Sequence, residues 1–166
     1  MKYKMCRQTV SGGDMNVQIW CCFSLLILLG GGNNSCDKKT FSDCNDFYEM
    51  SPKQRKDAFG ASSLERQYIL YLCGMHMEPP QMGYAWEIAK HGENAIQFLI
   101  EKLEKEQNDI TKRDIILIFE VIADNGHLRN KQDVISTIRQ IVANIQIENI
   151  KKQCRDMLSS IEKNSL

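Results

Sequence analysis

The chain has 166 residues, and its 21 Lys and Arg balance its 21 Asp and Glu, so the formal net charge at pH 7 is zero. A nucleic-acid-binding domain concentrates basic charge on one face, whereas lysines and glutamates are interleaved here. We therefore expect no nucleic acid partner. The length corresponds to one globular domain, large enough to bury roughly two-thirds of its unfolded surface.

An apolar run over residues 19–29 is the most informative segment of the sequence. Lys2, Lys4 and Arg7 precede it, and a triple glycine beginning at Gly30 follows it. As a helix rising ~1.5 Å per residue, the run reaches about half of the ~30 Å hydrocarbon core of a bilayer. A basic start, a short apolar core and small residues behind it are typical of a secretory signal. We therefore predict that residues 1–35 are an export signal peptide.

The end of this signal allows two interpretations. Gly30 and Gly32 suit an ordinary signal-peptidase cut before Asn33. Alternatively, Ser35-Cys36 resembles the end of a bacterial lipobox, although Asn33 stands where that motif usually has Leu. The resemblance implies a lipidated Cys36 as the mature N-terminus and a membrane anchor on the periplasmic side of the bacterial envelope. Without lipidation the protein is periplasmic or secreted, and Cys36 is free to form a disulfide.

The cysteines depend on this choice. Removing the signal leaves a small set of cysteines in an oxidising compartment, where disulfides are permitted: Cys36, Cys44, Cys73 and Cys154. If Cys36 is lipidated, at most one disulfide forms; otherwise two are possible, with the connectivity open. Because the chain contains no Cys-x-x-Cys pair, neither a zinc knuckle nor a thioredoxin-like site is expected.

Residues 36–50 are polar and lack hydrophobic periodicity, so we predict a tether between the anchor and the folded part. A short turn anchored by Phe41, Phe47 and Tyr48 is the structure that this segment could form. The folded part is expected over residues 51–166.

Helical signals begin directly after the tether. Ser51 caps a short helix that has proline at its first position and ends at Gly60. Ser62 and Glu65 have the spacing of a capping box, which opens a helix that ends at Gly74. One face of this helix carries apolar residues at helical spacing, namely Leu64, Tyr68, Tyr71 and Leu72.

The central helices are the most regular. A helix over residues 83–90 follows the turn that the double proline imposes. Residues 93–106 present a single apolar stripe of Ile96, Leu99, Ile100 and Leu103. Thr111 is the expected cap of the next helix, which runs to Gly126. Its β-branched residues could suit a buried strand, but its length and its i, i+3, i+4 spacing favour a helix. Because it is apolar nearly all round, we expect it to be the most buried element.

The C-terminal part also has a helical period. Residues 131–144 place Val134, Ile138, Ile141 and Val142 on one face, and residues 147–161 continue with a second apolar face. The sequence leaves open whether these segments are two helices or one helix bent near Asn144.

The helices recur at roughly 31 to 38 residues, which is a solenoid spacing. Residues 92–103, a polar turn and a second apolar helix together resemble a HEAT repeat. The likeness covers 92–126 closely and 62–90 and 131–162 loosely, and the layout is similar to HEAT-like exported bacterial lipoproteins. This resemblance implies an all-α fold, a short right-handed stack of antiparallel helical hairpins, with a habit of binding proteins rather than a reaction.

One local cluster could carry metal chemistry. Cys73, Met75, His76 and Met77 offer thiol, thioether and imidazole donors, which are the soft ligands that Cu(I) prefers. The alternative is that the methionines are flexible apolar side chains that fill the gap under the proline loop. We expect no bound cofactor, and copper binding is kept as the alternative function.

The sequence offers less support for a catalytic site than for a metal site. Cys73 has His76, His91 and His127 as conceivable bases, but no local signature supports any pairing. His91 and His127 flank helix-ending glycines, where an imidazole usually interacts with the last carbonyls and the helix dipole. No metalloprotease, phosphate-loop or nucleophile-elbow motif is present. We therefore predict that the protein is not an enzyme.

Aromatic residues surround the double proline: Tyr68, Tyr71, Tyr84 and Trp86. Most are expected in the core, but any that face outward would form a binding hot spot, because Tyr and Trp are enriched there. The predicted function is therefore that of an exported, lipid-anchored, non-catalytic protein-binding module in the bacterial envelope. Its partner is an envelope protein, and its membrane contact is the lipid anchor.

Overall fold

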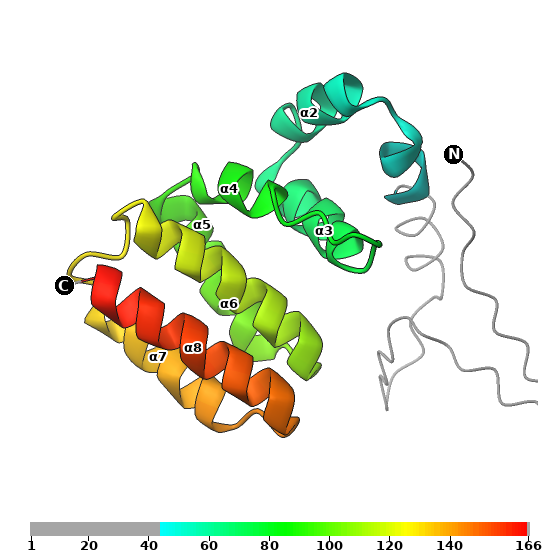
Figure 1. The fold of residues 1–166 in the computed structure, drawn as a ribbon. Helices are drawn as coiled ribbons and strands as arrows, with labels where there is room; N and C mark the ends of the chain where they lie inside the picture. Colours follow the sequence, from blue (N-terminus) through cyan, green and yellow to red (C-terminus); the bar gives the residue numbers. More distant parts are fainter. Residues whose placement is uncertain (1–43, 166) are drawn as a thin grey trace, which may run out of the picture. The chain divides into compact units, whose positions relative to one another are not determined.

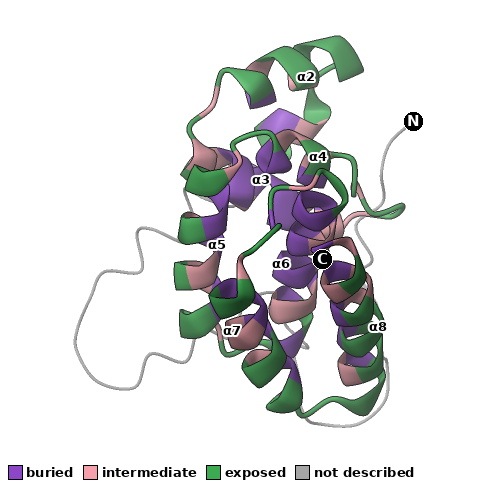
Figure 2. Ribbon diagram, turned by 90° about the vertical axis from the view of Figure 1, so that its left-hand side faces the viewer, coloured by how far each residue is buried: buried purple, intermediate pink, exposed green. Residues whose placement is uncertain are grey.

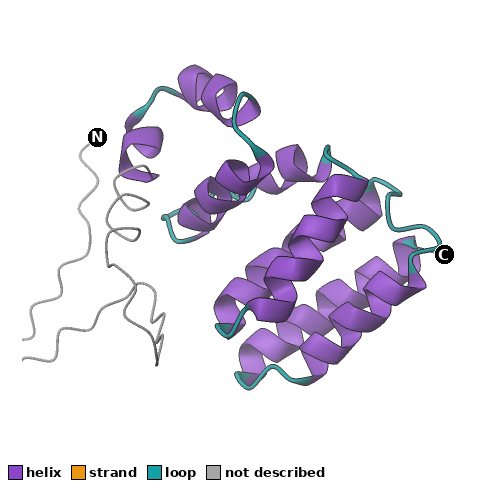
Figure 3. Cartoon of the chain, turned by 180° about the vertical axis from the view of Figure 1, so that it is seen from behind, coloured by secondary structure: helices purple, strands orange, loops and turns teal. Residues whose placement is uncertain are grey.

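The computed structural model describes residues 44–165, and within this range the regular structure is entirely helical (Figures 1 and 3). A helical segment at 44–49 is followed by α2 (Pro52–Gly60), α3 (Leu64–Met75), α4 (Tyr84–Ala89), α5 (Glu93–Lys105), α6 (Asp109–Asp124), α7 (Gln132–Ala143) and α8 (Glu148–Asn164). The predicted all-α class is confirmed. The predicted signal over 1–35, the lipidation site Cys36 and Phe41 lie outside the described residues. In the described part, every helix is too short or too polar to span a bilayer.

The N-terminal part of the folded region begins earlier than the sequence predicted. Residues 44–49 are helical, Phe47 is buried, and Cys44 forms a disulfide with Cys73. The tether predicted over 36–50 therefore includes residues that belong to the core. Burial of Phe47 and the bond between Cys44 and Cys73 hold this polar segment against the rest of the fold. We call residues 44–49 the strap.

The caps of the first helices are partly as predicted. Ser51 accepts the Gln54 amide hydrogen, Gln54 accepts the Ser51 amide hydrogen in return, and proline opens α2. The cap of α3, however, is Ser63, whose hydroxyl accepts from Arg66 N at 3.3 Å. The predicted cap Ser62 instead donates to Ala58 O at the end of α2, at 2.8 Å. Ser63 therefore caps α3 while Ser62 bonds the end of α2, and the predicted cap at Ser62 is wrong by one residue.

Helix α6 is the centre of the fold, as its composition predicted. Most of its apolar side chains are fully or almost fully buried, including Ile115, Ile118, Phe119 and Ile122 (Figure 2). It contacts α3, α4, α5 and α8. The helix begins at Asp109 with Asn108 as its cap, rather than at the predicted Thr111. At its other end Gly126 has φ +76°, a left-handed turn that lets His127 N donate to Ile122 O at 3.1 Å.

The C-terminal segment is two helices rather than one bent helix. Helix α7 ends at Ala143, and α8 begins at Glu148. The connection is held by Asp109 of α6, whose Oδ2 accepts from Gln146 N at 2.8 Å and from Ile147 N at 3.0 Å. One carboxylate thus joins the turn before α6 to the turn before α8.

Consecutive helices contact each other as hairpins and also contact the next hairpin. The pairs α3–α4, α5–α6 and α7–α8 are in contact. Between hairpins, α4 contacts α6, α6 contacts α8, and α5 contacts α7 (Figure 1). Ion pairs reinforce the outer contacts, with Lys102 to Glu65 at 3.0 Å and Lys131 to Glu93 at 2.6 Å. These exposed pairs contribute less than about 1 kcal/mol each, so apolar burial determines the packing.

Candidate functional site

The predicted metal loop does not keep its ligand set. Cys73 is bonded to Cys44, so its sulfur is not a thiolate ligand, which corrects the proposed grouping with Met75, His76 and Met77. Met75 packs against the core, and His76 is the exposed C-cap of α3. Among residues 44–165, no three His, Cys, Asp or Glu side chains gather as a metal site would require. The same disulfide removes Cys73 as a catalytic nucleophile.

The remaining described cysteine is also unsuited to nucleophilic chemistry. Cys154 is a free thiol in the core, on the buried face of α8. Burial raises its pKa to about 11, against which the nearby Arg113 acts only weakly. At neutral pH it is therefore a protonated thiol, and a nucleophile needs the thiolate.

Two of the four predicted partner-binding aromatics lie in the core. Tyr71 is fully buried and donates its hydroxyl to Asp114 O at 2.8 Å. Tyr68 is buried edge-on against Phe98, with ring centroids 5.5 Å apart. Burial raises the pKa of both tyrosines well above the ordinary value. Neither ring is available to a partner on this fold, so the hot-spot prediction is corrected for both.

The other two aromatics, on α4, are accessible. The helix buries Ala85, Ile88 and Ala89, which leaves Trp86 49% exposed on its outer side. Met82, just before the helix, is 55% exposed. A single exposed apolar residue is common on protein surfaces, but tryptophan is enriched at binding hot spots, which makes Trp86 a candidate contact residue. In the described residues Trp86 is the only tryptophan, since Trp20 lies in the predicted signal.

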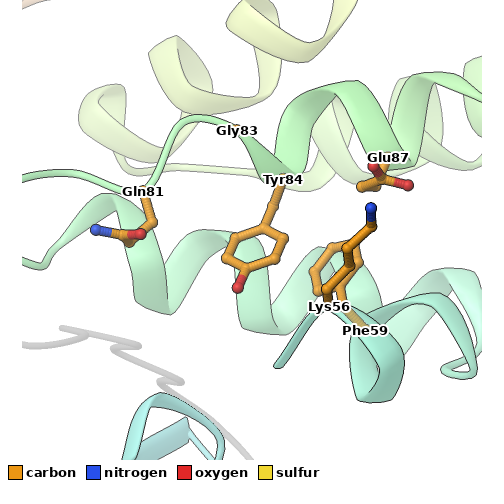
Figure 4. A pocket seen from close by; sticks show the side chains of 6 residues that line it. All are labelled: Lys56, Phe59, Gln81, Gly83, Tyr84 and Glu87. Carbon is orange, nitrogen blue, oxygen red and sulfur yellow. The ribbon is translucent and has the colours of Figure 1, made fainter. Parts of the chain in front are cut away.

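Tyr84 forms the wall of a small pocket between α2 and α4. Its ring stacks on Phe59, with centroids 4.3 Å apart and planes at 25°. The pocket has a volume of about 170 Å³ and is lined by Lys56, Phe59, Gln81, Gly83, Tyr84 and Glu87 (Figure 4). Drug-sized ligands and cofactors need roughly 300–1,000 Å³, so this pocket suits one side chain of a larger partner. Lys56 and Glu87 point toward each other beside the Phe59 ring and supply opposite charges for a polar backbone (Figure 4).

The strap packs against the two aromatic residues that line this pocket. The Phe47 centroid lies 5.7 Å from that of Tyr84 and 6.2 Å from that of Phe59. Tyr48 lies 6.3 Å from Tyr84 and donates its hydroxyl to Leu70 O at 2.7 Å. Four aromatic rings from the strap, α2 and α4 therefore form one cluster. Phe47-Tyr48 in an otherwise polar segment was the signal in the sequence, but its partners could not be read there.

The strap is held by a near balance of energies. Ordering its residues costs on the order of 6–12 kcal/mol at ~1–2 kcal/mol each. Burial of Phe47, the Tyr48 hydrogen bond and the ring contacts offset about 4–7 kcal/mol. The disulfide spans 29 positions and contributes about 3.6 kcal/mol in the chain-entropy treatment. These contributions are of similar size, and the covalent bond adds to the contacts that hold the strap in place.

The buried side-chain amide of Gln67 joins α3 to the end of α2, next to Phe59 of the pocket. Gln67 Nε2 donates to Phe59 O at 2.9 Å and to Ser62 O at 3.3 Å, at the end of α2. Its Oε1 lies 2.8 Å from His91 Nε2. Because that oxygen can only accept, His91 carries its hydrogen on Nε2. His91 thus links α4 to α3 rather than serving the carbonyls at the end of α4, as the sequence suggested.

A second hollow, of about 540 Å³, lies where the turns before α6 and α8 meet. Ile110 and Ile147 line it and are exposed. The other lining residues are polar: Gln107, Asn108, Asp109, Lys112, Asn144 and Gln146. This surface could not be predicted from the sequence, because residues separated by some 37 positions form it only after the hairpins pack.

Comparisons with protein-family models, with curated proteins and with solved structures found no match.

Proposed function

We propose that the protein is an exported, lipid-anchored envelope protein whose helical domain is a non-catalytic protein-binding module. In this proposal Tyr84, Trp86 and the pocket between α2 and α4 contact the partner. The observation that carries it is the coincidence of an exposed tryptophan and a side-chain-sized aromatic pocket on the same helix, α4.

The disulfide supports export. Disulfides persist in secreted and periplasmic proteins and are rare in the cytosol of most organisms. The Cys44–Cys73 bond is therefore consistent with a leader over 1–35 that directs the chain out of the cytosol. With Cys44 paired and Cys154 buried, Cys36 has no described cysteine left to pair with, which favours lipidation over a second disulfide.

The packing of successive hairpins supports a HEAT-like, right-handed stack. In such a stack each helix contacts its hairpin partner and the equivalent helix of the next hairpin, and the contacts of α4, α6 and α8 follow this order. The carboxylate of Asp109 links equivalent turns of neighbouring hairpins. Solenoids of this kind present continuous helical surfaces to protein partners, which agrees with a binding role.

A lipidated Cys36 would also place the binding surface close to the membrane. The chain between Cys36 and Cys44 spans at most about 28 Å when fully extended. Stable anchoring needs two or more acyl chains, as a triacylated N-terminal cysteine supplies. The partner would then be another protein at the same membrane surface.

The pocket suggests how the partner binds. A volume of about 170 Å³ accommodates one apolar or aromatic side chain stacked on Tyr84 and Phe59. The exposed Trp86 and Met82 add apolar surface on α4 and just before it. Lys56 and Glu87 can hydrogen-bond the carbonyl and amide groups of the partner's backbone.

Capture of crosslinked envelope proteins tests the proposal, with the full chain expressed in cells. We expect Trp86→Ala and Tyr84→Ala to lose the captured partner by about tenfold or more, since hot-spot residues contribute about 2 kcal/mol or more. Ile147→Ala is the matched control, because Ile147 is 47% exposed but lies in the other hollow. Equal capture by all three variants, or no partner for the wild type, would contradict the binding role. Intact-mass spectrometry of the same material reports whether Cys36 is lipidated.

A further inference from the structure

The disulfide, the strap and the pocket are parts of one arrangement. Cys73 lies near the end of α3, and its bond to Cys44 holds the start of the strap there. Three positions later, Phe47 touches the rings of both Phe59 and Tyr84, the two aromatic residues of the pocket. A chemical change at the sulfurs is therefore transmitted to the pocket wall through a few residues.

We propose that the Cys44–Cys73 disulfide is a redox lock on the aromatic pocket. When it is oxidised, the strap stays in place and holds Tyr84 stacked on Phe59. When it is reduced, the strap leaves, the ring cluster loses two of its four members, and the pocket opens along α2 and α4. The device regulates the site assigned to partner binding, so its biological consequence rests on the proposed function, while the opening itself does not.

The chemical step is a thiol–disulfide exchange with a dithiol reductant. A thiolate of the reductant bonds to Cys73 Sγ, the Sγ–Sγ bond breaks, and Cys44 leaves as a thiolate and takes up a proton. The second thiolate of the reductant displaces Cys73, which is protonated in turn. The reductant, having given two electrons, leaves as a disulfide. Attack begins at Cys73, because this residue is partly exposed whereas Cys44 is buried.

We expect the change to stay local, because contacts other than those of the strap hold the rest of the fold together. Most of the core is built on α6 and its neighbours, and the strap adds Phe47 to the same buried apolar cluster. Phe59 and Tyr84 are also held by their own helices, and Gln67 ties the end of α2 to α3. Losing the strap therefore removes the contacts of Phe47 with the Phe59 and Tyr84 rings of the pocket, and we expect α5 to α8 to stay intact.

Hydrogen exchange with mass-spectrometric detection tests the lock on the protein isolated from cells that express the full chain. With dithiothreitol, we expect exchange to rise about tenfold or more in the peptides that cover 44–50 and to rise measurably in those over 84–89. Exchange over 115–123 in α6 should not change. The double variant Cys44→Ser/Cys73→Ser should show the fast pattern without reductant and no further response to it. Cys154→Ala, which alters the other described thiol, should respond as the wild type does.

Two results would overturn the proposal. Unchanged exchange at 84–89 after verified reduction would show that the strap does not support the pocket. Acceleration throughout the described helices would show that the disulfide holds the whole fold rather than a local element. Because no partner is needed for this measurement, it separates the lock from the binding role: a positive exchange result with failed capture would leave the lock and remove the function assigned to its pocket.

Discussion

The carboxylate of Asp109 should contribute far more to stability than its place in the first turn of a helix would suggest. Its Oδ2 accepts the amide hydrogens of Gln146 and Ile147, and its Oδ1 lies 3.3 Å from Lys112 Nζ. Hydrogen bonds to a charged group contribute about 1.5–3 kcal/mol each, and the two share one oxygen. We therefore expect Asp109→Ala to lower the free energy of unfolding by about 2–4 kcal/mol.

Asp133 provides the matched control. It stands in the first turn of α7, is exposed, and its side chain has no hydrogen bond or ion pair within residues 44–165. Asp133→Ala should cost only the dipole contribution of about 0.3–1 kcal/mol. Urea denaturation followed by circular dichroism measures both variants. If the two costs agree within about 0.5 kcal/mol, the carboxylate does not join the two turns as described.

The effect of Asp109 should depend on pH in a defined direction. Burial by itself raises the pKa of this carboxyl, but the amide hydrogens of Ile147 and Gln146 together with Lys112 lower it below the ordinary 3.8. Because the folded-state pKa is lowered, the stabilisation is complete above the unfolded pKa of about 3.8 and is lost as the pH falls from there through the lowered pKa. The cost of Asp109→Ala should thus shrink between pH 4 and pH 2. A cost that grows over this range would refute the assignment.

Two further substitutions test the packing around the strap and the central helix. Gly74→Ala should destabilise the protein by about 1–3 kcal/mol, because a Cβ there would overlap the Tyr48 hydroxyl and press on Gln81. The control Gly60→Ala, in open space within α2, should be neutral or stabilising by up to about 1 kcal/mol. If thermal melts show Gly60→Ala to be the more destabilising of the two, the close approach at Gly74 is contradicted. Burial raises the pKa of the Asp114 carboxyl. The wild type should therefore lose stability as the pH rises through that raised pKa, whereas Asp114→Asn should not. If the difference in stability between the wild type and Asp114→Asn is constant from pH 4 to 7, this carboxyl does not titrate in the folded state as inferred.

The elements of this fold follow from local rules with few exceptions. Of the predicted stripe, Ile96, Leu99 and Leu103 are buried and Ile100 is partly buried, and the long apolar run after Asn108 is the central helix. The failures are the helical strap, which was predicted as a tether, and errors of register at helix starts, such as the choice between Ser62 and Ser63. Ser62 and Ser63 are equally good N-caps by local rules. The end of α2 binds the Ser62 hydroxyl, which leaves Ser63 to cap α3.

The candidate site could be predicted only as a region. The sequence located the aromatics around the double proline but could not separate the buried Tyr68 and Tyr71 from the accessible Tyr84 and Trp86. Helical spacing gives the angle between side chains on one helix, whereas exposure depends on which neighbours cover each face. Helix α6 covers the face of α3 that carries Tyr71, and no described element covers Trp86 to the same degree.

By itself, the sequence determined the helical class, the order of the helices and the most buried one, because periodicity and helix-stop residues act within a few positions of the chain. Tertiary structure alone decided the Cys44–Cys73 pairing, the docking of the strap and the assembly of the pocket from α2, the 81–83 turn and α4. Each of these joins groups that are distant along the chain, and their contact depends on how whole helices pack rather than on any local preference.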